Sequence, residues 1–205
     1  MTSLFSLKQV LPIALLLVAF SSKGQQHQVE VSSGVITTTS IIVGVSDAIQ
    51  TAAVELINDA NGNTASLRFE GDRVLNPTYG ISYENRFHKH WSFIGDYTYQ
   101  PITRSVYYDG TFRGTVSSRA HTFGIGIKGR YWVSEWTEGY SALRIAGTNQ
   151  VDEYDIEDES QTLSWGYTNT QITLFGLRVG KQLGANLELG FGYGGVVKYG
   201  LDYRF

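Results

Sequence analysis

The end of the chain, residues 187–205, alternates large apolar side chains with glycine or charged residues almost without interruption. The pattern runs through Leu187–Tyr193, turns at Gly194 and Gly195, and resumes over Val197–Phe205. A period of two is typical of β-strands whose two faces meet different surroundings. In a soluble sandwich the large side chains would pack against a second sheet, whereas in a membrane barrel they face lipid and the charges lie inside. We therefore expect antiparallel strands, with Tyr193 among the outward side chains.

The start of the chain has the features of a secretory signal peptide. Lys8 precedes an apolar run at 10–20, and a small-x-small site ends at Gly24. The run is too short for a bilayer, because a spanning helix takes about 20 apolar residues. We expect residues 1–24 to be removed near Gly24, which leaves a single domain at 25–205. An uncleaved anchor is the alternative.

After residue 24 no apolar run is long enough for a transmembrane helix, so any membrane span is made of strands. The expected mature length is 205 − 24 = 181 residues, room for about eight crossings of about 9–11 residues each. Alternating segments occur at about 28–35, 72–87, 91–107, 119–132, 136–148, 165–183, 187–193 and 197–205. We predict an all-β fold, a single antiparallel up-and-down transmembrane β-barrel of about eight strands. The strand count changes by two if residues 64–70 form an extra hairpin.

The connections between these segments alternate in length. Residues 88–90, 133–135 and 181–185 are short turns, and residues 36–71, 108–118 and 149–164 are long loops. Bacterial barrels have short periplasmic turns and longer external loops. We therefore expect both termini in the periplasm and the long loops outside the cell.

Residues 40–58 interrupt the strand pattern with helical spacing. The apolar residues at this spacing are Ile41, Val45, Ile49, Ala52 and Leu56. We predict an amphipathic helix in the first external loop, with Thr38, Thr39 or Ser40 as its N-cap. Packing on the barrel rim is the favoured place for this helix, because its polar face has no lysine or arginine to hold it on a membrane surface. A position flat at the outer headgroup level, a plug in the barrel mouth and docking of a partner are further possibilities.

The leader, this helix, the turn at 89–92 and the C-terminal pattern together resemble the small outer-membrane β-barrel proteins of Bacteroidota, which are similar in layout to the OmpA transmembrane domain and OmpX. The helix is a departure from the simplest members. The resemblance implies a Gram-negative outer membrane, contact with its lipids and lipopolysaccharide, and insertion by the barrel-assembly machinery. The assembly signal of that class maps onto Tyr199, Leu201, Tyr203 and Phe205. The resemblance supplies no substrate or surface ligand.

The inward parity of the predicted strands carries many charges. The expected interior ion-pair network consists of Glu30, Glu84, Arg86, Asp96, Lys128, Arg130, Glu138, Arg144, Arg178, Glu188, Lys198, Asp202 and Arg204. About eight strands enclose an interior that side chains can just fill. A charge in such a space needs a partner, and the near balance of acids and bases favours pairing over ion selectivity. We expect a filled lumen, with a polar channel as the alternative.

No metal site, cofactor or catalytic group stands out. The acidic run at 152–159 lacks the glycine and terminal glutamate of a calcium loop, so we expect it to be a solvated loop. His88 and His90 have no third ligand nearby for zinc. The mature chain carries 14 basic and 19 acidic residues, a balance of −5 that argues against nucleic-acid binding.

His121, near Ser117 and Ser118, is the one candidate for catalysis, as a base beside a serine nucleophile at the outer rim of the barrel. No acid that would orient the histidine is visible. The sequence therefore favours an outer-membrane barrel with a structural or surface-interaction role and no enzymatic activity. A small-solute channel is the first alternative and a lipid A-modifying enzyme is the second.

Overall fold

The computed structural model describes residues 26–71, 76–156 and 159–205. The expected signal peptide at 1–24 lies outside the described residues. So do residues 72–75, at the start of the second alternating segment, and the acidic residues Glu157 and Asp158.

Eight strands form a closed ring in which all neighbours are antiparallel. Each strand of the wall pairs with the next one along the chain, and β1 closes the ring by pairing with both β3 and β9. The wall consists of β1 (Gln26–Val35), β3 (Thr78–His88), β4 (Trp91–Tyr108), β5 (Thr111–Val133), β6 (Thr137–Ile156), β7 (Glu159–Gly180), β8 (Leu183–Gly192) and β9 (Val197–Arg204). The predicted single antiparallel up-and-down barrel of eight strands is confirmed.

The segment between β1 and β3 contains the predicted helix, α2 (Thr38–Ala60), and a short strand, β2 (Leu67–Glu70). By length and composition α2 could span a membrane, so the expectation that no segment after residue 24 could do so as a helix was wrong. Thr37 is the N-cap of α2, since its hydroxyl accepts a hydrogen bond from the Ser40 amide at 3.1 Å. The predicted cap was thus one to three residues too late. β2 pairs only with the far end of β4, so it does not add a strand to the wall.

Two of the predicted loops are strands instead. β4 and β5 stay paired up to Tyr108 and Thr111, and β6 and β7 stay paired up to Ile156 and Glu159. The predictions of loops at 108–118 and 149–164 were therefore wrong. In the first hairpin, Asp109 and Gly110 have φ values of 49° and 72°. Two left-handed residues form the tight turn that matches the twist of paired strands, so no longer loop is needed.

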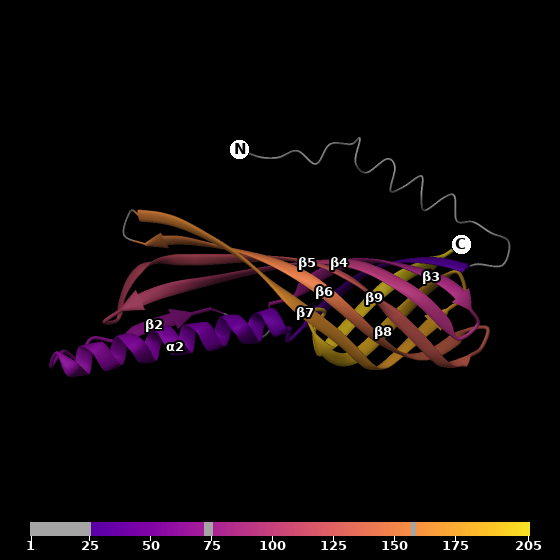
Figure 1. The fold of residues 1–205 in the computed structure, drawn as a ribbon, viewed down its shortest axis with the longest axis horizontal. Coiled ribbons are helices and arrows are strands. Elements are labelled where there is room, and N and C mark those ends of the chain that lie inside the picture. The colour runs from indigo at the N-terminus through magenta and orange to yellow at the C-terminus, as the bar shows by residue number, and fades with distance from the viewer. Residues whose placement is uncertain (1–25, 72–75, 157–158) are drawn as a thin grey trace.

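The resulting molecule has two parts along one axis (Figure 1). One part is the closed barrel, and the backbone of His27 there bonds that of Phe205, so both described chain ends lie at the same rim. The other part, which we call the extension, consists of α2, β2 and the far halves of the β4–β5 and β6–β7 hairpins. β5 and β7 have 23 and 22 residues, whereas β8 and β9, which stop at the barrel rim, have 10 and 8.

Irregularities in pairing explain where the period-two pattern is broken. The register of β7 against β8 shifts between Thr173 and Phe175, so Leu174 and Phe175 are both exposed on the outside. At the end of β8, Gly192 has a φ of 145°, and Tyr193 turns into the lumen, where it is 2% exposed. The expectation that Tyr193 faces outward was therefore wrong, because the regular alternation ends one residue earlier.

Candidate functional site

The barrel has a polar interior and an apolar outer wall. Among the buried residues, polar and charged side chains greatly outnumber apolar ones. On the outside, Ile125 is 75% exposed and Leu174 is 73% exposed. This is the reverse of a water-soluble fold, in which such residues fill the core. All thirteen residues of the expected interior network lie on the inner side, and each makes at least one ion pair.

Glu188 lies at the centre of the lumen and is 1% exposed. Its carboxylate accepts hydrogen bonds from both terminal nitrogens of Arg144, at 3.2 and 3.0 Å, and from the Thr173 hydroxyl at 2.8 Å. The Tyr140 hydroxyl donates a fourth at 3.1 Å, and Lys198 Nζ is 3.8 Å away. These groups come from β6, β7 and β9, which follow one another with β8 in the ring, so the carboxylate ties together one half of the wall.

Two further carboxylates extend this central cluster. Lys198 Nζ lies 2.6 Å from Glu30 Oε1, and Arg144 Nε lies 3.6 Å from Asp96 Oδ2. The Tyr193 hydroxyl also reaches Asp96, with O···O distances of 2.8 and 2.9 Å to the two carboxylate oxygens. The space beside Asp96 and Tyr193 exists only because residue 124 is glycine, since a β-carbon there would collide with both side chains.

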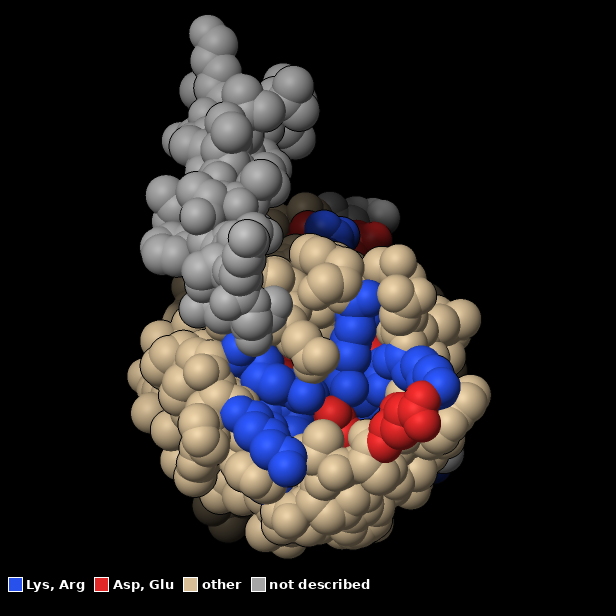
Figure 2. Space-filling model, turned by 90° about the vertical axis from the view of Figure 1, so that its right-hand side faces the viewer, with Lys and Arg blue, Asp and Glu red and all other residues tan. Residues whose placement is uncertain are grey.

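A second cluster fills the end of the barrel that carries the short turns. Glu138 accepts hydrogen bonds from Arg86 Nη2 at 2.7 Å, Arg130 Nε at 3.1 Å and Arg204 Nη1 at 2.8 Å. Figure 2 views the molecule from this end and shows basic side chains gathered in the middle of the ring, with little acid among them. One carboxylate thus serves three guanidinium groups, two of which, those of Arg86 and Arg204, remain partly exposed at the rim.

The other ion pairs of the expected network lie beside these two clusters in the lumen. Glu84 lies 2.7 Å from Lys128 Nζ and also pairs with Arg130. Arg178 lies 2.6 Å from Asp202. Lys128 Nζ is also 4.2 Å from the centre of the Tyr140 ring, a favourable cation–π distance.

Little free space remains between these side chains. One cavity, lined by Arg144, Lys198, Gln171 and their neighbours, has a volume of about 10 Å³. A single water molecule needs about 10–15 Å³. The middle of the lumen therefore holds at most one water at this point, which is incompatible with an open aqueous path there.

The start of α2 closes the other mouth of the barrel. The Thr37 hydroxyl donates to Gln100 Oε1 at 2.6 Å, and the Thr38 hydroxyl donates to Asn169 Oδ1 at 3.0 Å. Further along the helix, buried Asp47 forms an ion pair with Arg104 of β4. The first turns of this helix contact the barrel rim as predicted, although most of its length projects beyond the rim along the extension (Figure 1). The buried residues of the helix are Thr39, Ser40, Val43 and Asp47. The predicted apolar face does not pack, since Ile41, Val45, Ile49 and Leu56 are all exposed.

The extension differs from the barrel in that its strands have a polar outer face, while its interior mixes apolar side chains with polar ones such as Arg104 and Asp152. Its buried side chains include Ile102, Val106 and Val116, which are 1%, 4% and 0% exposed. Its outer face carries polar residues on the same strands that carry apolar ones in the barrel, including Thr103, Arg119, Asn149, Asp155 and Ser164. This is the pattern of a sheet that meets water on its outer face. The surroundings of the outer face therefore change part-way along β4, β5, β6 and β7.

Aromatic side chains mark both limits of the apolar wall. At the extension side, the Tyr97 hydroxyl lies 2.8 Å from His121 Nδ1, and the Tyr99 and His121 ring centres are 5.1 Å apart. At the other end, Trp91 and the aromatic rings near the short turns are exposed. Trp91 and Tyr99 are eight residues apart on β4, or about 27 Å along the strand at about 3.4 Å per residue. For a strand tilted by about 35–45° this corresponds to a height of about 19–22 Å. Barrels in outer membranes have an apolar band about 25 Å tall between two aromatic girdles.

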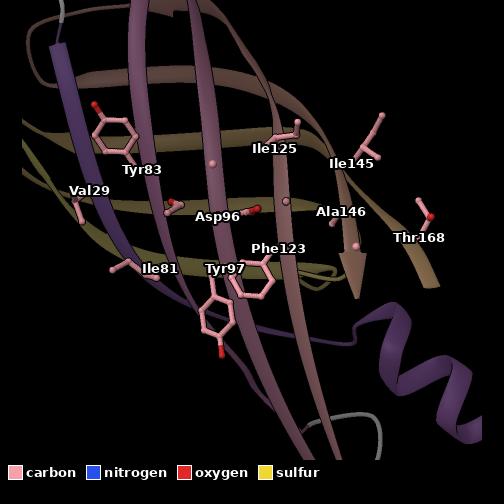
Figure 3. A pocket seen from close by; sticks show the side chains of 14 residues that line it. Val29, Ile81, Tyr83, Asp96, Tyr97, Phe123, Ile125, Ile145, Ala146 and Thr168 are labelled. Atoms are coloured by element: carbon pink, nitrogen blue, oxygen red, sulfur yellow. The ribbon is translucent and has the colours of Figure 1, made fainter. Parts of the chain in front are cut away.

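Between these limits the outer wall is hollowed into a shallow apolar furrow of about 900 Å³. Gly95 and Gly147 form part of it, and a β-carbon at either position would meet nothing within 4 Å. The rings of Tyr97 and Phe123, from neighbouring strands, lie side by side at one end of it, with centres 4.8 Å apart (Figure 3). The furrow has the shape and polarity of a surface covered by hydrocarbon chains.

The sequence-based candidates for catalysis and metal binding are not assembled into sites. His121 lies on the outer face, whereas Ser118 is buried on the inner face and accepts a hydrogen bond from Arg104 at 2.9 Å. Ser117 shares the outer face of β5 with His121 but is four residues away along the strand. Among the described residues, no group of three or more His, Asp or Glu side chains is placed to hold a metal ion.

The acidic run at 152–159 was expected to be a solvated loop, but its described residues belong to β6 and β7. Asp152 is buried and accepts hydrogen bonds from Gln150 Nε2 and Trp165 Nε1, while Glu153 pairs with Arg119 on the outer face. The sequence reasoning also missed the buried Arg104–Asp47 pair. The inward parity of Gln100, Ile102 and Arg104 on β4 was the available signal.

No protein-family model matches this chain, and no curated protein matches it. Two solved structures of Ail, the attachment invasion locus protein of Yersinia pestis, are similar in shape. The one in complex with the heparin analogue sucrose octasulfate has 11% identity and a TM-score of 0.45, and the match covers 88% of this chain and 99% of that chain. The other has 12% identity and a TM-score of 0.44, and covers 88% and 98%. No ligand of this chain follows from that likeness.

Proposed function

We propose that this protein is an integral outer-membrane β-barrel that anchors and presents an external interaction platform, and that it does not conduct solutes. The single observation that carries the proposal is the change of polarity along β4–β7. The same strands show apolar side chains outward in the barrel and polar side chains outward in the extension. A membrane around the barrel and water on the outer sheet face of the extension account for both halves of these strands.

The orientation follows from the ends of the strands. Both described chain ends and the turns β3–β4, β5–β6 and β7–β8 lie at one rim, while α2 and the long hairpins of the extension lie at the other (Figure 1). Since outer-membrane barrels keep short turns in the periplasm, the extension would project outside the cell. The proposal includes removal of the leader near Gly24, and insertion by the barrel-assembly machinery reading Tyr199, Leu201, Tyr203 and Phe205. These four side chains are all exposed on the outer wall.

A structural role is supported over a channel by the contents of the lumen. The Glu188 and Glu138 clusters block its length, and the start of α2 covers the mouth. A water-filled path would require these ion pairs to separate, and breaking a buried pair costs about 3–5 kcal/mol. No catalytic step is part of the proposal, because His121 and the nearby serines are not arranged as a nucleophile and base.

Two experiments test the proposal. In planar lipid bilayers the purified protein should give no stable current, because the Glu188 cluster, the Glu138 cluster and the start of α2 each obstruct the lumen. A steady large current from the unchanged protein would overturn the closed lumen.

The orientation is tested with single cysteines, because the chain has none of its own. A membrane-impermeant maleimide should label Thr111→Cys, near the tip of the β4–β5 hairpin, on intact cells. The matched variant Ser134→Cys, at an opposite turn, should react only after the outer membrane is opened. The reverse pattern would show that the extension faces the periplasm.

A further inference from the structure

A small pocket lies in the extension, between the first half of α2 and the inner face of β4, β6 and β7. Its volume is about 200 Å³, below the about 300–1,000 Å³ of pockets for drug-sized ligands. It therefore fits one small molecule or one unit of a longer chain. It is separate from the filled lumen and from the furrow on the outer wall, and neither the anchoring role nor the ion pairs require it.

The floor of the pocket is a set of polar side chains fixed in place by hydrogen bonds. Asp152, which is 7% exposed, accepts from Gln150 Nε2 at 2.9 Å through one oxygen and from Trp165 Nε1 at 3.0 Å through the other. The Trp165 ring stacks on Tyr167 at 4.9 Å, and the Tyr167 hydroxyl lies 3.0 Å from the Thr39 hydroxyl of α2. The aromatic wall and the carboxylate are thus held before any ligand arrives, which lowers the entropic cost of binding.

Several of these groups have unused hydrogen-bonding capacity. Gln150 Oε1 and Arg104 Nε are buried, and neither has a hydrogen-bond partner among the described residues. Each oxygen of Asp152 takes one donor and has a second lone pair available. Gln50 and Tyr154 add an amide and a phenol to the lining. Ten buried polar atoms of the described residues have no hydrogen-bond partner, and the two on Gln150 and Arg104 belong to residues that line the pocket, where a ligand would supply the missing partners.

The mixture of groups restricts the chemistry of that ligand. Acceptors on Asp152 and Gln150 and donors on Arg104 and Gln50 together suit a molecule whose own groups both donate and accept, such as a set of hydroxyls. The exposed ring of Trp165 offers an apolar surface for the C–H face of a sugar. A small ring that carries several hydroxyls has both features.

The charge of the pocket excludes two other classes. The described charged groups that line or adjoin it are Arg104, its ion-pair partner Asp47, and Asp152, whose two hydrogen-bond donors are neutral. The excess negative charge disfavours a phosphate or a sulfated ligand. A cationic amine would place its charge beside Arg104 and would leave the donors of Arg104 and Gln50 unused.

We propose that this pocket binds a neutral sugar unit, with Asp152 and Gln150 as hydrogen-bond acceptors, Arg104 and Gln50 as donors, and Trp165 as the stacking surface. The inference gives the external platform a ligand class, and in that sense it rests on the proposed function. It places recognition in the extension and leaves the barrel as the anchor.

The test uses the fluorescence of Trp165 in the purified full-length protein. The chain has four tryptophans, so the triple variant Trp91→Phe, Trp132→Phe and Trp136→Phe reports on Trp165 alone. It is titrated, in a detergent without a sugar headgroup, with the methyl glycosides of glucose, galactose, mannose, N-acetylglucosamine and fucose. At least one should give a saturable change with a Kd of about 1 mM or below, a normal strength for so small a ligand. Tetramethylammonium and sucrose octasulfate should give none.

Matched variants separate a specific site from a general effect. Asp152→Asn should weaken binding by about tenfold or more, since hydrogen bonds to charged groups are worth about 1.5–3 kcal/mol. Asp155→Asn, on the outer face of the same strand, should leave the Kd within about twofold by the same reasoning. Gln50→Ala is a second test in case Asp152→Asn fails to fold, because Gln50 lies at an exposed position of α2. This variant should weaken sugar binding by about threefold or more.

The absence of saturation by every glycoside, equal losses in Asp152→Asn and Asp155→Asn, or preferential binding of tetramethylammonium or sucrose octasulfate would each overturn the proposal. The titration needs neither a membrane nor a closed lumen. If the protein binds no sugar, but carries no current in planar bilayers and its cysteine variants react with maleimide as described above, the proposed function stays intact. A conducting protein that binds a sugar would overturn only the closed lumen.

Discussion

Replacement of Glu188 by glutamine is the most direct test of the filled lumen. The substitution keeps the volume of the side chain and removes its charge. Two nitrogens of Arg144, the hydroxyls of Thr173 and Tyr140, and Lys198 all direct donors at this carboxylate, which is 1% exposed. In the variant, one amide oxygen has to serve these donors, and the new NH₂ group is itself a donor placed among them.

The expected loss of stability follows from this geometry. Removing one member of a buried ion pair costs about 3–5 kcal/mol, because the remaining charge stays desolvated. Arg144 retains only the more distant Asp96 carboxylate at 3.6 Å, and Lys198 retains Glu30 at 2.6 Å. We therefore expect Glu188→Gln to lower the free energy of unfolding by about 3–5 kcal/mol.

The measurement is a reversible urea titration of the protein in lipid vesicles, followed by tryptophan fluorescence. Glu153→Gln is the control, since it breaks the Arg119–Glu153 pair on the outer face, where the two side chains are 49% and 42% exposed. That pair should contribute less than about 1 kcal/mol. If the two variants lost similar amounts, below about 1 kcal/mol, the reasoning that buried ion pairs hold the ring together would be refuted.

Three other perturbations test the remaining parts of the account. Ile125→Lys places a charge on the apolar wall and should cost about 2–4 kcal/mol in lipid vesicles, a loss that would be absent if the wall met water. Gly176→Ala should lower the urea concentration at the unfolding midpoint, because a β-carbon there collides with the Tyr140 ring. The double variant with Tyr140→Leu should recover part of the lost stability. If it did not, the collision with Tyr140 would not be the cause of the loss. Asp47→Asn removes the ion partner of buried Arg104. The variant should be cleaved faster by proteases within α2, while the heat-dependent gel shift of the barrel stays unchanged. If α2 were cleaved no faster than in the unchanged protein, the ion pair would not be what keeps the helix in place.

Much of the fold was predictable because a barrel wall is governed by a local rule. Alternate side chains of a strand point to opposite faces, so the inward and outward sets can be read from the sequence once the strand is recognised. The inner positions of Glu138, Arg144 and Arg178 follow directly from that parity. The helix was recognisable for the same reason, since its apolar residues recur at the spacing of a turn.

The errors arose where the local rule is interrupted. Tyr193 follows a glycine with a left-handed backbone, so its parity is lost and the side chain enters the lumen. The loops predicted at 108–118 and 149–164 were assigned because their polar residues differ from the apolar wall. Those residues are polar because the extension meets water on its outer face, and they remain in strands.

The sequence by itself determined the eight-stranded antiparallel barrel, the two faces of its wall and the presence of one helix. These features depend on period, length and composition, which are properties of neighbouring residues. Only the tertiary structure decided which ions pair across the lumen, that Arg104 meets Asp47, and that Trp165, Asp152 and Gln50 surround one pocket. Some of these contacts join residues far apart in the sequence, such as Arg104 with Asp47 and Lys198 with Glu30. Their partners depend on the stagger of the closed ring and on the path of the helix over its mouth, which no local pattern encodes.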